Sequence, residues 1–196
     1  FPSINDEKKE RYIDALCREI SSWSEKAADR IVDTVYFGGG TPTLLTVSQF
    51  EKIIETVKEN FCVSKEAEIT TECNPATADG EYLKELRSLG FNRISLGVQS
   101  ANDRELALLG RVHTFSDAKK AFYDARRAGF ENISVDLMFG IPEQTEESFK
   151  NTLDEIFKLS PEHVSAYSLI VEPGTPFFAN YKKLVLPDED SEYNMY

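Results

Sequence analysis

The sequence is poor in several residue types, and each shortage argues against a class of protein. Of its 196 residues, three are cysteine, two are histidine and 22 are Lys or Arg, against 34 Asp or Glu. The resulting net charge of −12 argues against a nonspecific nucleic-acid binder, because phosphate binding needs clustered Lys and Arg. No apolar run approaches the roughly 18 residues of a membrane span, and no signal peptide opens the chain. We therefore expect a cytoplasmic protein that binds no nucleic acid and makes at most transient membrane contact.

The few cysteines and histidines do not form a metal-binding pattern. Cys17, Cys62 and Cys73 are 45 and 11 residues apart, which matches no C-x-x-C or related motif. Their low, odd number is typical of structural thiols in a reducing compartment. His113 and His163 also lack ligand spacing, so we interpret both as ordinary polar contacts. We predict no metal ligands within this chain.

The sequence does contain a repeated alternation of strand-like and helix-like segments. Runs rich in β-branched and apolar residues predict strands over 34–37, 68–72, 93–98, 133–138 and 163–170. Apolar residues at helical spacing predict a helix over 6–23, before the first strand. Capping patterns and terminal glycines predict helices after each of the first four strands. Their expected starts are Thr46, Thr77 or Asp79, Asn102 (as a capping box with Glu105), Ser116 and Thr145.

This alternation predicts an α/β fold with parallel strands joined by right-handed crossovers. Five strands do not close an eight-strand barrel, so we predict an open curved sheet or a partial parallel barrel with helices outside. The first helix should follow a strand that is missing here, and an acidic helix start at the far end stops abruptly. We therefore predict a fragment: residues 1–186 as an incomplete core, and 187–196 as the start of a further region.

Unusual residues stand where four of the strands end. A glycine loop, Gly38-Gly-Gly-Thr-Pro42, follows the first strand, and Glu72 and Gln99 end the second and third. Asp136 interrupts the apolar fourth strand. Because parallel α/β folds place their sites at the carboxyl ends of the strands, we expect these groups to meet on one rim.

Each of these residues also has a purely structural interpretation. The glycines suit a tight turn, or else the close approach of a ligand to bare backbone. Asp136 is costly to bury unless hydrogen-bonded, and it could cap a loop instead of binding a ligand. Glu72 and Gln99 could be solvent-facing strand ends, and Arg111 could be a cation favoured at a helix C-terminus. The loop has no Lys and lacks P-loop spacing, which excludes a nucleotide P-loop but leaves a phosphorylated metabolite open.

The order of motifs resembles a radical S-adenosylmethionine (SAM) protein. The matching segments are YFGGGTP (36–42), ECNP (72–75), LGVQS (96–100), LGRVH (109–113), DLMFGIP (136–142) and EPGTP (172–176). They are similar to the oxygen-independent coproporphyrinogen III oxidase group, and more closely to its HemW branch, the haem chaperones. The resemblance covers nearly the whole chain.

The resemblance implies SAM as the cofactor and a set of residues that bind it, without a catalytic residue in this chain. The implied residues are Gly39, Gly40, Thr41, Glu72, Gln99, Arg111, Asp136 and Ile170. The first three would contact the methionine moiety through backbone, the next four would hold the amino-acid and ribose parts, and the last would lie near the adenine. In the family a reduced [4Fe–4S] cluster cleaves SAM to a radical.

Two features of the family are absent from this sequence. The C-x-x-x-C-x-x-C loop that binds the cluster would end just before Phe1, and the C-terminal segment linked to haem binding is not present. We expect this fragment alone not to hold the cluster and not to cleave SAM. For the complete protein the resemblance implies a haem chaperone, with haem or porphyrin, an apo-haemoprotein recipient and an electron donor as partners. The alternatives are a true anaerobic coproporphyrinogen oxidase and a barrel that binds a phosphorylated metabolite.

Overall fold

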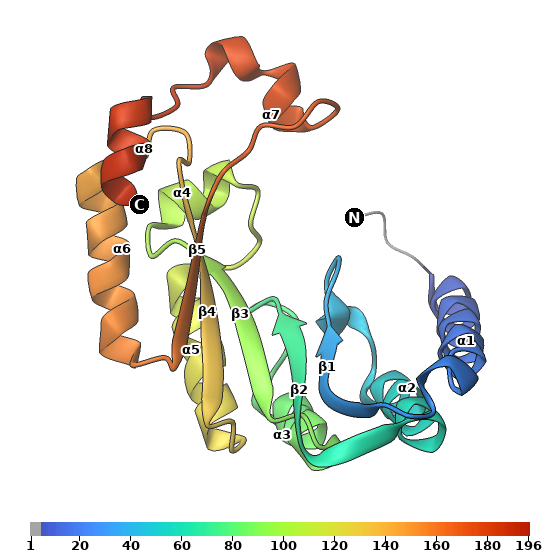
Figure 1. The fold of residues 1–196 in the computed structure, drawn as a ribbon. Coiled ribbons are helices and arrows are strands. Elements are labelled where there is room, and N and C mark those ends of the chain that lie inside the picture. Colours follow the sequence, from blue (N-terminus) through green and yellow to red (C-terminus); the bar gives the residue numbers. More distant parts are fainter. Residues whose placement is uncertain (1–4) are drawn as a thin grey trace. The chain divides into compact units, whose positions relative to one another are not determined.

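The computed structural model describes residues 5–196, and Phe1, the expected neighbour of the cluster loop, lies outside the described residues. The described residues form five strands. Figure 1 shows helices between them along the chain. The strands are β1 (Ile31–Phe37), β2 (Cys62–Cys73), β3 (Arg93–Gln99), β4 (Asn132–Phe139) and β5 (His163–Ser168). The α-helices are α1 (Asp6–Ser22), α2 (Val47–Asn60), α3 (Gly80–Leu89), α4 (Asp103–Leu108), α5 (Phe115–Arg127), α6 (Glu146–Leu159), α7 (Pro176–Ala179) and α8 (Glu189–Met195). Short 3-10 turns cover Glu25–Ala27, Pro42–Leu44 and Tyr181–Lys183.

The strands form one sheet in the order β1-β2-β3-β4-β5, and the pairs β1–β2 and β4–β5 are parallel. The parallel pairing is the outcome predicted from strand–helix alternation. Three strand ends differ from the prediction by two residues or more. β1 begins at Ile31, three residues before the expected start. β2 begins at Cys62, six residues before the expected start. β5 ends at Ser168, because Ile170 already belongs to an exposed segment that leads into the turn at Pro173.

The chain divides into two compact units. Unit 1 comprises residues 1–73, 77–94 and 124–131, and unit 2 comprises 74–76, 95–123 and 132–196.

Unit 1 has an aromatic core under β1 and β2. The rings of Phe37, Phe50 and Phe91 have centroids 5.1–5.2 Å apart, and Phe50 and Phe91 are fully buried. Helix α2 starts at the predicted capping box, in which Thr46 accepts from the Gln49 N–H and the Gln49 side chain accepts from the Thr46 N–H. Helix α1 lies beside α2.

Unit 2 buries one face of β4 completely. Ile133, Val135 and Leu137 have no exposed surface, whereas Asp136 and Met138 on the alternate face are half-buried. The predicted Thr145 cap starts α6, and α8 lies against α6 near the chain end (Figure 1).

The predicted acidic helix start near the end of the chain is confirmed as α8, which Asp188 caps by accepting from the Ser191 N–H. None of the helices described within residues 5–196 combines the length and hydrophobicity that crossing a bilayer requires.

Candidate functional site

The residues predicted to bind SAM fall in both units. Gly39, Gly40, Thr41 and Glu72 belong to unit 1. Gln99, Arg111, Asp136 and Ile170 belong to unit 2.

In unit 1 the carboxylate of Glu72 holds the glycine loop. Its Oε2 accepts from the Gly39 N–H at 3.2 Å, and its Oε1 accepts from the Tyr36 hydroxyl at 2.8 Å. Tyr36 pairs with Thr70 in the parallel register, and Glu72 lies two residues further along β2. Side chains alternate along a strand, so Tyr36 and Glu72 project from the same face. Glu72 is therefore part of the loop assembly rather than an isolated strand-end residue.

Two glycines of this loop are required for different reasons. Gly39 has φ 111°, a left-handed conformation that side chains rarely adopt. A Cβ at Gly38 would lie 2.5 Å from Cε1 of Tyr36 and 3.0 Å from Oε1 of Glu72. Gly40, which is exposed, and Thr41, which is half-buried, complete the loop before the 3-10 turn. The tight-turn interpretation thus accounts for Gly39, whereas Gly38 makes room for the Tyr36 ring.

In unit 2 the Asp136 carboxylate is hydrogen-bonded, as its burial cost predicts. The hydroxyl of Ser95 on β3 lies 3.0 and 3.1 Å from the two carboxylate oxygens. The flanking residues Val135 and Leu137 point to the opposite, fully buried face. Asp136 therefore lies on the opposite face of β4 from these apolar residues, and the Ser95 hydroxyl holds its carboxylate in place as a hydrogen-bond acceptor.

Gln99 and Arg111 share a neighbour in Tyr167. The Tyr167 hydroxyl donates to Oε1 of Gln99 at 2.8 Å. Burial lowers the pKa of Arg111, and the acidic groups Tyr167 and Asp136 nearby act in the opposite direction. At neutral pH the guanidinium is still charged, so unit 2 contains a half-buried cation close to a carboxylate.

The turn after α4 determines where Arg111 lies. The N–H of Gly110 donates to the Ala107 carbonyl at 3.0 Å, and the N–H of Arg111 donates to the Leu106 carbonyl at 2.9 Å. This pair of bonds is a Schellman motif that ends the helix. Ile170, in contrast, lies two residues after β5 and is 74% exposed.

Sequence reasoning missed the side chains that hold the predicted ones. Ser95, Tyr36 and Tyr167 hydrogen-bond to Asp136, Glu72 and Gln99 respectively. None of the three has a predicted role, although Tyr36 opens the matched segment 36–42. The alternation of side chains along a strand was the available signal. Ser95 and Gln99 are both at odd-numbered positions of β3, so their side chains are expected on the same face.

The prediction for α4 is wrong in one respect. Asn102 caps the helix through the Arg104 N–H, but the Glu105 carboxylate accepts from the Asn102 side-chain amide at 3.5 Å and not from the Asn102 backbone N–H, which donates to Ser100. The Glu105 side chain is buried and also accepts from Ser100, Ser148 and Gln144. The capping-box pattern in the sequence therefore gave no indication that the Glu105 carboxylate is buried.

The residues described here do not fit an iron–sulfur cluster. Within residues 5–196, no group of three or more His, Cys, Asp or Glu side chains could hold a metal ion. Cys17 is half-buried, Cys62 is exposed and Cys73 is buried, and burial raises the pKa of the Cys73 thiol to about 12. A buried, protonated thiol is a poor metal ligand.

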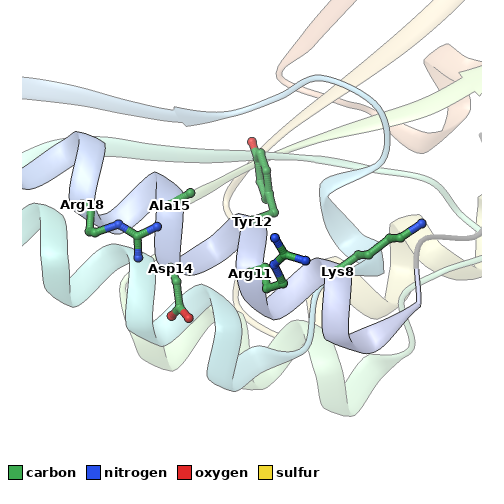
Figure 2. A pocket seen from close by; sticks show the side chains of 6 residues that line it. All are labelled: Lys8, Arg11, Tyr12, Asp14, Ala15 and Arg18. Atoms are coloured by element: carbon green, nitrogen blue, oxygen red, sulfur yellow. The ribbon is translucent and has the colours of Figure 1, made fainter.

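A separate open pocket of about 440 Å³ lies along α1 (Figure 2). Its lining consists of Lys8, Arg11, Tyr12, Asp14, Ala15 and Arg18, all from one helix. Asp14 is paired with Lys52 on α2 at 2.5 Å. This pocket contains none of the residues predicted to bind SAM.

Comparison with known sequences identifies relatives along nearly the whole chain. The family model described as the Radical SAM superfamily matches residues 2–156. The haem chaperone HemW of Bacillus subtilis is 39% identical, over 98% of this chain and 52% of its own length. HemW of Escherichia coli is 35% identical, over 94% of this chain and 48% of its own length. The chain thus spans about half the length of these relatives.

Comparison with solved structures gives the same fold. The coproporphyrinogen III oxidase HemN of Escherichia coli, a radical SAM enzyme, superposes with a TM-score of 0.86 at 34% identity, over 96% of this chain and 44% of its own. The archaeal Elp3 of Methanocaldococcus infernus gives a TM-score of 0.73 at 21% identity over 92% of this chain and 48% of its own, which concerns the fold alone. The predicted α/β fold, a partial parallel barrel with helices outside, is confirmed by these likenesses.

Proposed function

We propose, from the premise that the chain belongs to the radical SAM superfamily, that the full-length protein binds SAM and a [4Fe–4S] cluster and acts as a haem chaperone. The observation that carries the haem proposal is the similarity to HemW haem chaperones, at 33–39% identity over more than nine-tenths of this chain. When bound, SAM and the cluster supply the radical chemistry of the superfamily. The residues of this chain contribute binding and orientation.

In unit 1 the proposed SAM contacts are Gly39, Gly40, Thr41 and Glu72. A carboxylate accepts about four hydrogen bonds, and the described donors to Glu72 are one hydroxyl and one N–H. An ammonium or hydroxyl of SAM is a suitable further donor. The arrangement suits a phosphate poorly, because the Gly39 N–H already faces a negative carboxylate.

In unit 2 the proposed contacts are Gln99, Arg111, Asp136 and Ile170. Arg111 suits the carboxylate of SAM, since a guanidinium binds carboxylates by paired donors. Asp136, held by Ser95, suits a hydroxyl or ammonium donor. The exposed Ile170 side chain offers an apolar surface for the adenine.

The cluster is proposed to lie on ligands outside these 196 residues. The described cysteines do not come together, and the family loop that binds the cluster does not occur in the sequence.

SAM binding is tested by isothermal titration of the full-length protein, with Asp136→Asn as the variant and Asp154→Asn as its control. Asp154 is an exposed α6 residue paired with Lys150. Loss of a charged acceptor corresponds to about tenfold or more in affinity. We expect that loss for Asp136→Asn and no change for Asp154→Asn. A wild-type protein that binds a sugar phosphate but not SAM would contradict the proposal.

One alternative activity is favoured by a specific observation. The likeness to HemN, with its TM-score of 0.86, favours anaerobic conversion of coproporphyrinogen III to protoporphyrinogen IX. The reconstituted full-length protein should be given coproporphyrinogen without oxygen, and separately haem and an apo-haemoprotein. Haem transfer without porphyrinogen turnover supports the chaperone, and robust turnover supports the oxidase instead.

A further inference from the structure

The backbone at Gln99 is held in an unusual conformation. Its φ is 72°, and the Ser100 N–H donates to the Val98 carbonyl at 3.0 Å. Gln99 is therefore the central residue of a γ-turn with positive φ, which is rarer and more strained than the inverse γ-turn. Gln99 is also 2% exposed. A residue other than glycine persists in this conformation only where its surroundings determine it. We therefore consider which neighbouring groups hold the backbone and the side chain of Gln99 in place.

Both residues that flank Gln99 are fixed by buried side chains. His113 lies 3.3 Å through Nε2 from the Val98 carbonyl, and the Ser100 hydroxyl donates to Glu105 at 2.6 Å. Burial lowers the pKa of His113, so the ring is neutral at pH 7. A carbonyl can only accept, so the ring proton is on Nε2 and donates to Val98. The turn is thus anchored on each side before any ligand binds.

The Gln99 side chain has its own anchor in Tyr167. Tyr167 pairs with Met138 on β4, and its hydroxyl donates to Oε1 of Gln99 at 2.8 Å. With the amide oxygen engaged by a donor, the other end of the amide is an NH2 group with two hydrogens to donate. The orientation of the amide then decides whether Gln99 offers a donor or an acceptor.

We propose that Tyr167 is a positioning residue that orients the Gln99 amide so that its NH2 group donates to an acceptor oxygen of SAM. The proposal rests on the proposed function, because it names how one residue of the SAM site is oriented. Gln99 and Arg111 would then both be donors, whereas Asp136 is an acceptor. This division matches a ligand that carries a carboxylate as well as hydroxyl and ammonium groups.

The test is a double-mutant cycle in the full-length protein, with SAM affinity measured by isothermal titration. The variants are Tyr167→Phe, Gln99→Ala and the two combined. If Tyr167 acts through Gln99, Tyr167→Phe weakens SAM binding about three- to tenfold in the wild-type background. It then has no further effect when Gln99 is already Ala, whereas a merely structural role gives additive losses.

Two further variants make the outcome specific. Gln99→Glu keeps an acceptor for Tyr167 but removes the NH2 group, so we expect at least a tenfold loss of SAM affinity. Tyr193→Phe removes an exposed hydroxyl from α8 and should leave affinity and the unfolding temperature unchanged. Wild-type affinity in Gln99→Glu would mean that the amide oxygen faces SAM, which overturns the proposal.

Failure of this proposal differs from failure of the proposed function. A wild-type protein that does not bind SAM contradicts both. A wild-type protein that binds SAM, together with additive losses or an unaffected Tyr167→Phe variant, contradicts only the role of Tyr167.

Discussion

At the scale of single residues, the loop after β1 depends on an aromatic ring that lies over a glycine. A methyl group at Gly38 would come within 2.5 Å of the Tyr36 ring, a distance that real side chains do not adopt. Tyr36 is 57% exposed, so its ring can move aside. Such a movement would break the hydrogen bond between Tyr36 and Glu72 without disturbing the core.

We therefore predict that Gly38→Ala weakens SAM binding about tenfold in the full-length protein while destabilising the fold by only about 1 kcal/mol. The matched control is Gly80→Ala in the first turn of α3, where the new methyl group would lie 3.6 Å from Asp124, an ordinary contact. Alanine there should be neutral or slightly stabilising. Titration calorimetry and thermal unfolding measure the two effects. Wild-type SAM affinity in Gly38→Ala would show that the Tyr36–Glu72 contact does not matter for binding.

The sequence was sufficient to select residues with unusual chemistry but not their partners. Asp136 stands out because a carboxylate inside an apolar strand needs a hydrogen bond. Its partner Ser95 does not stand out, since a serine on a strand is common and only the pairing of strands brings it to Asp136. The same holds for Tyr167, which is 68 residues from Gln99 in the chain. Contacts set by strand register are not visible in a single sequence.

At the scale of secondary-structure elements, a buried carboxylate joins four segments of unit 2. Glu105 on α4 is 3% exposed and accepts from Ser100 after β3, from Ser148 on α6 and from Gln144 before α6. The Thr152 hydroxyl on α6 accepts from the Ala101 N–H at 3.1 Å, next to the same cluster. A single acid thus satisfies several buried donors that would otherwise lose water without a partner.

We predict that Glu105→Ala destabilises the protein by about 3 kcal/mol, because it leaves at least two buried donors unsatisfied and opens a cavity. The control is Glu55→Ala on the exposed face of α2, for which less than about 0.5 kcal/mol is expected. Urea unfolding followed by circular dichroism measures both changes. Equal stability of the two variants would contradict a structural role for the Glu105 cluster.

Elements whose signals are local were predicted well. Thr46 and Thr145 are the N-caps that the sequence predicts, and of the two predicted candidates Thr77 and Asp79 it is Asp79 that caps its helix. Helix α5 starts one residue before the expected Ser116, because Thr114 and Asp117 cap each other. Glu105 was misinterpreted because its sequence spacing fits a capping box, while tertiary contacts gave it stronger partners. Local chemistry predicts where helices begin, and tertiary burial decides what an ambiguous side chain does.

At the scale of the whole molecule, residues 5–196 include side chains that we propose to bind SAM, but no group of side chains among them is suited to the cluster. Its relatives are about twice as long as the matched region, so a division of the two tasks along the full-length sequence is consistent with the comparisons. The cysteines provide a direct test of this division. They are the soft ligands that an iron–sulfur cluster requires, and all three differ in exposure.

We predict that the full-length protein keeps its cluster when Cys17 and Cys62 are replaced by Ser and Cys73 by Ala, singly and together. The Cys73→Ala change should lower stability by about 1 kcal/mol, because the thiol is buried, without altering iron content. Iron and sulfide per protein, together with the visible absorption of the cluster, are compared with the wild type after anaerobic reconstitution. Loss of iron in any single variant would place a cluster ligand within these 196 residues. Unchanged iron in the triple variant, with SAM binding retained, is the result expected if this part of the protein holds SAM while cysteines elsewhere hold the cluster.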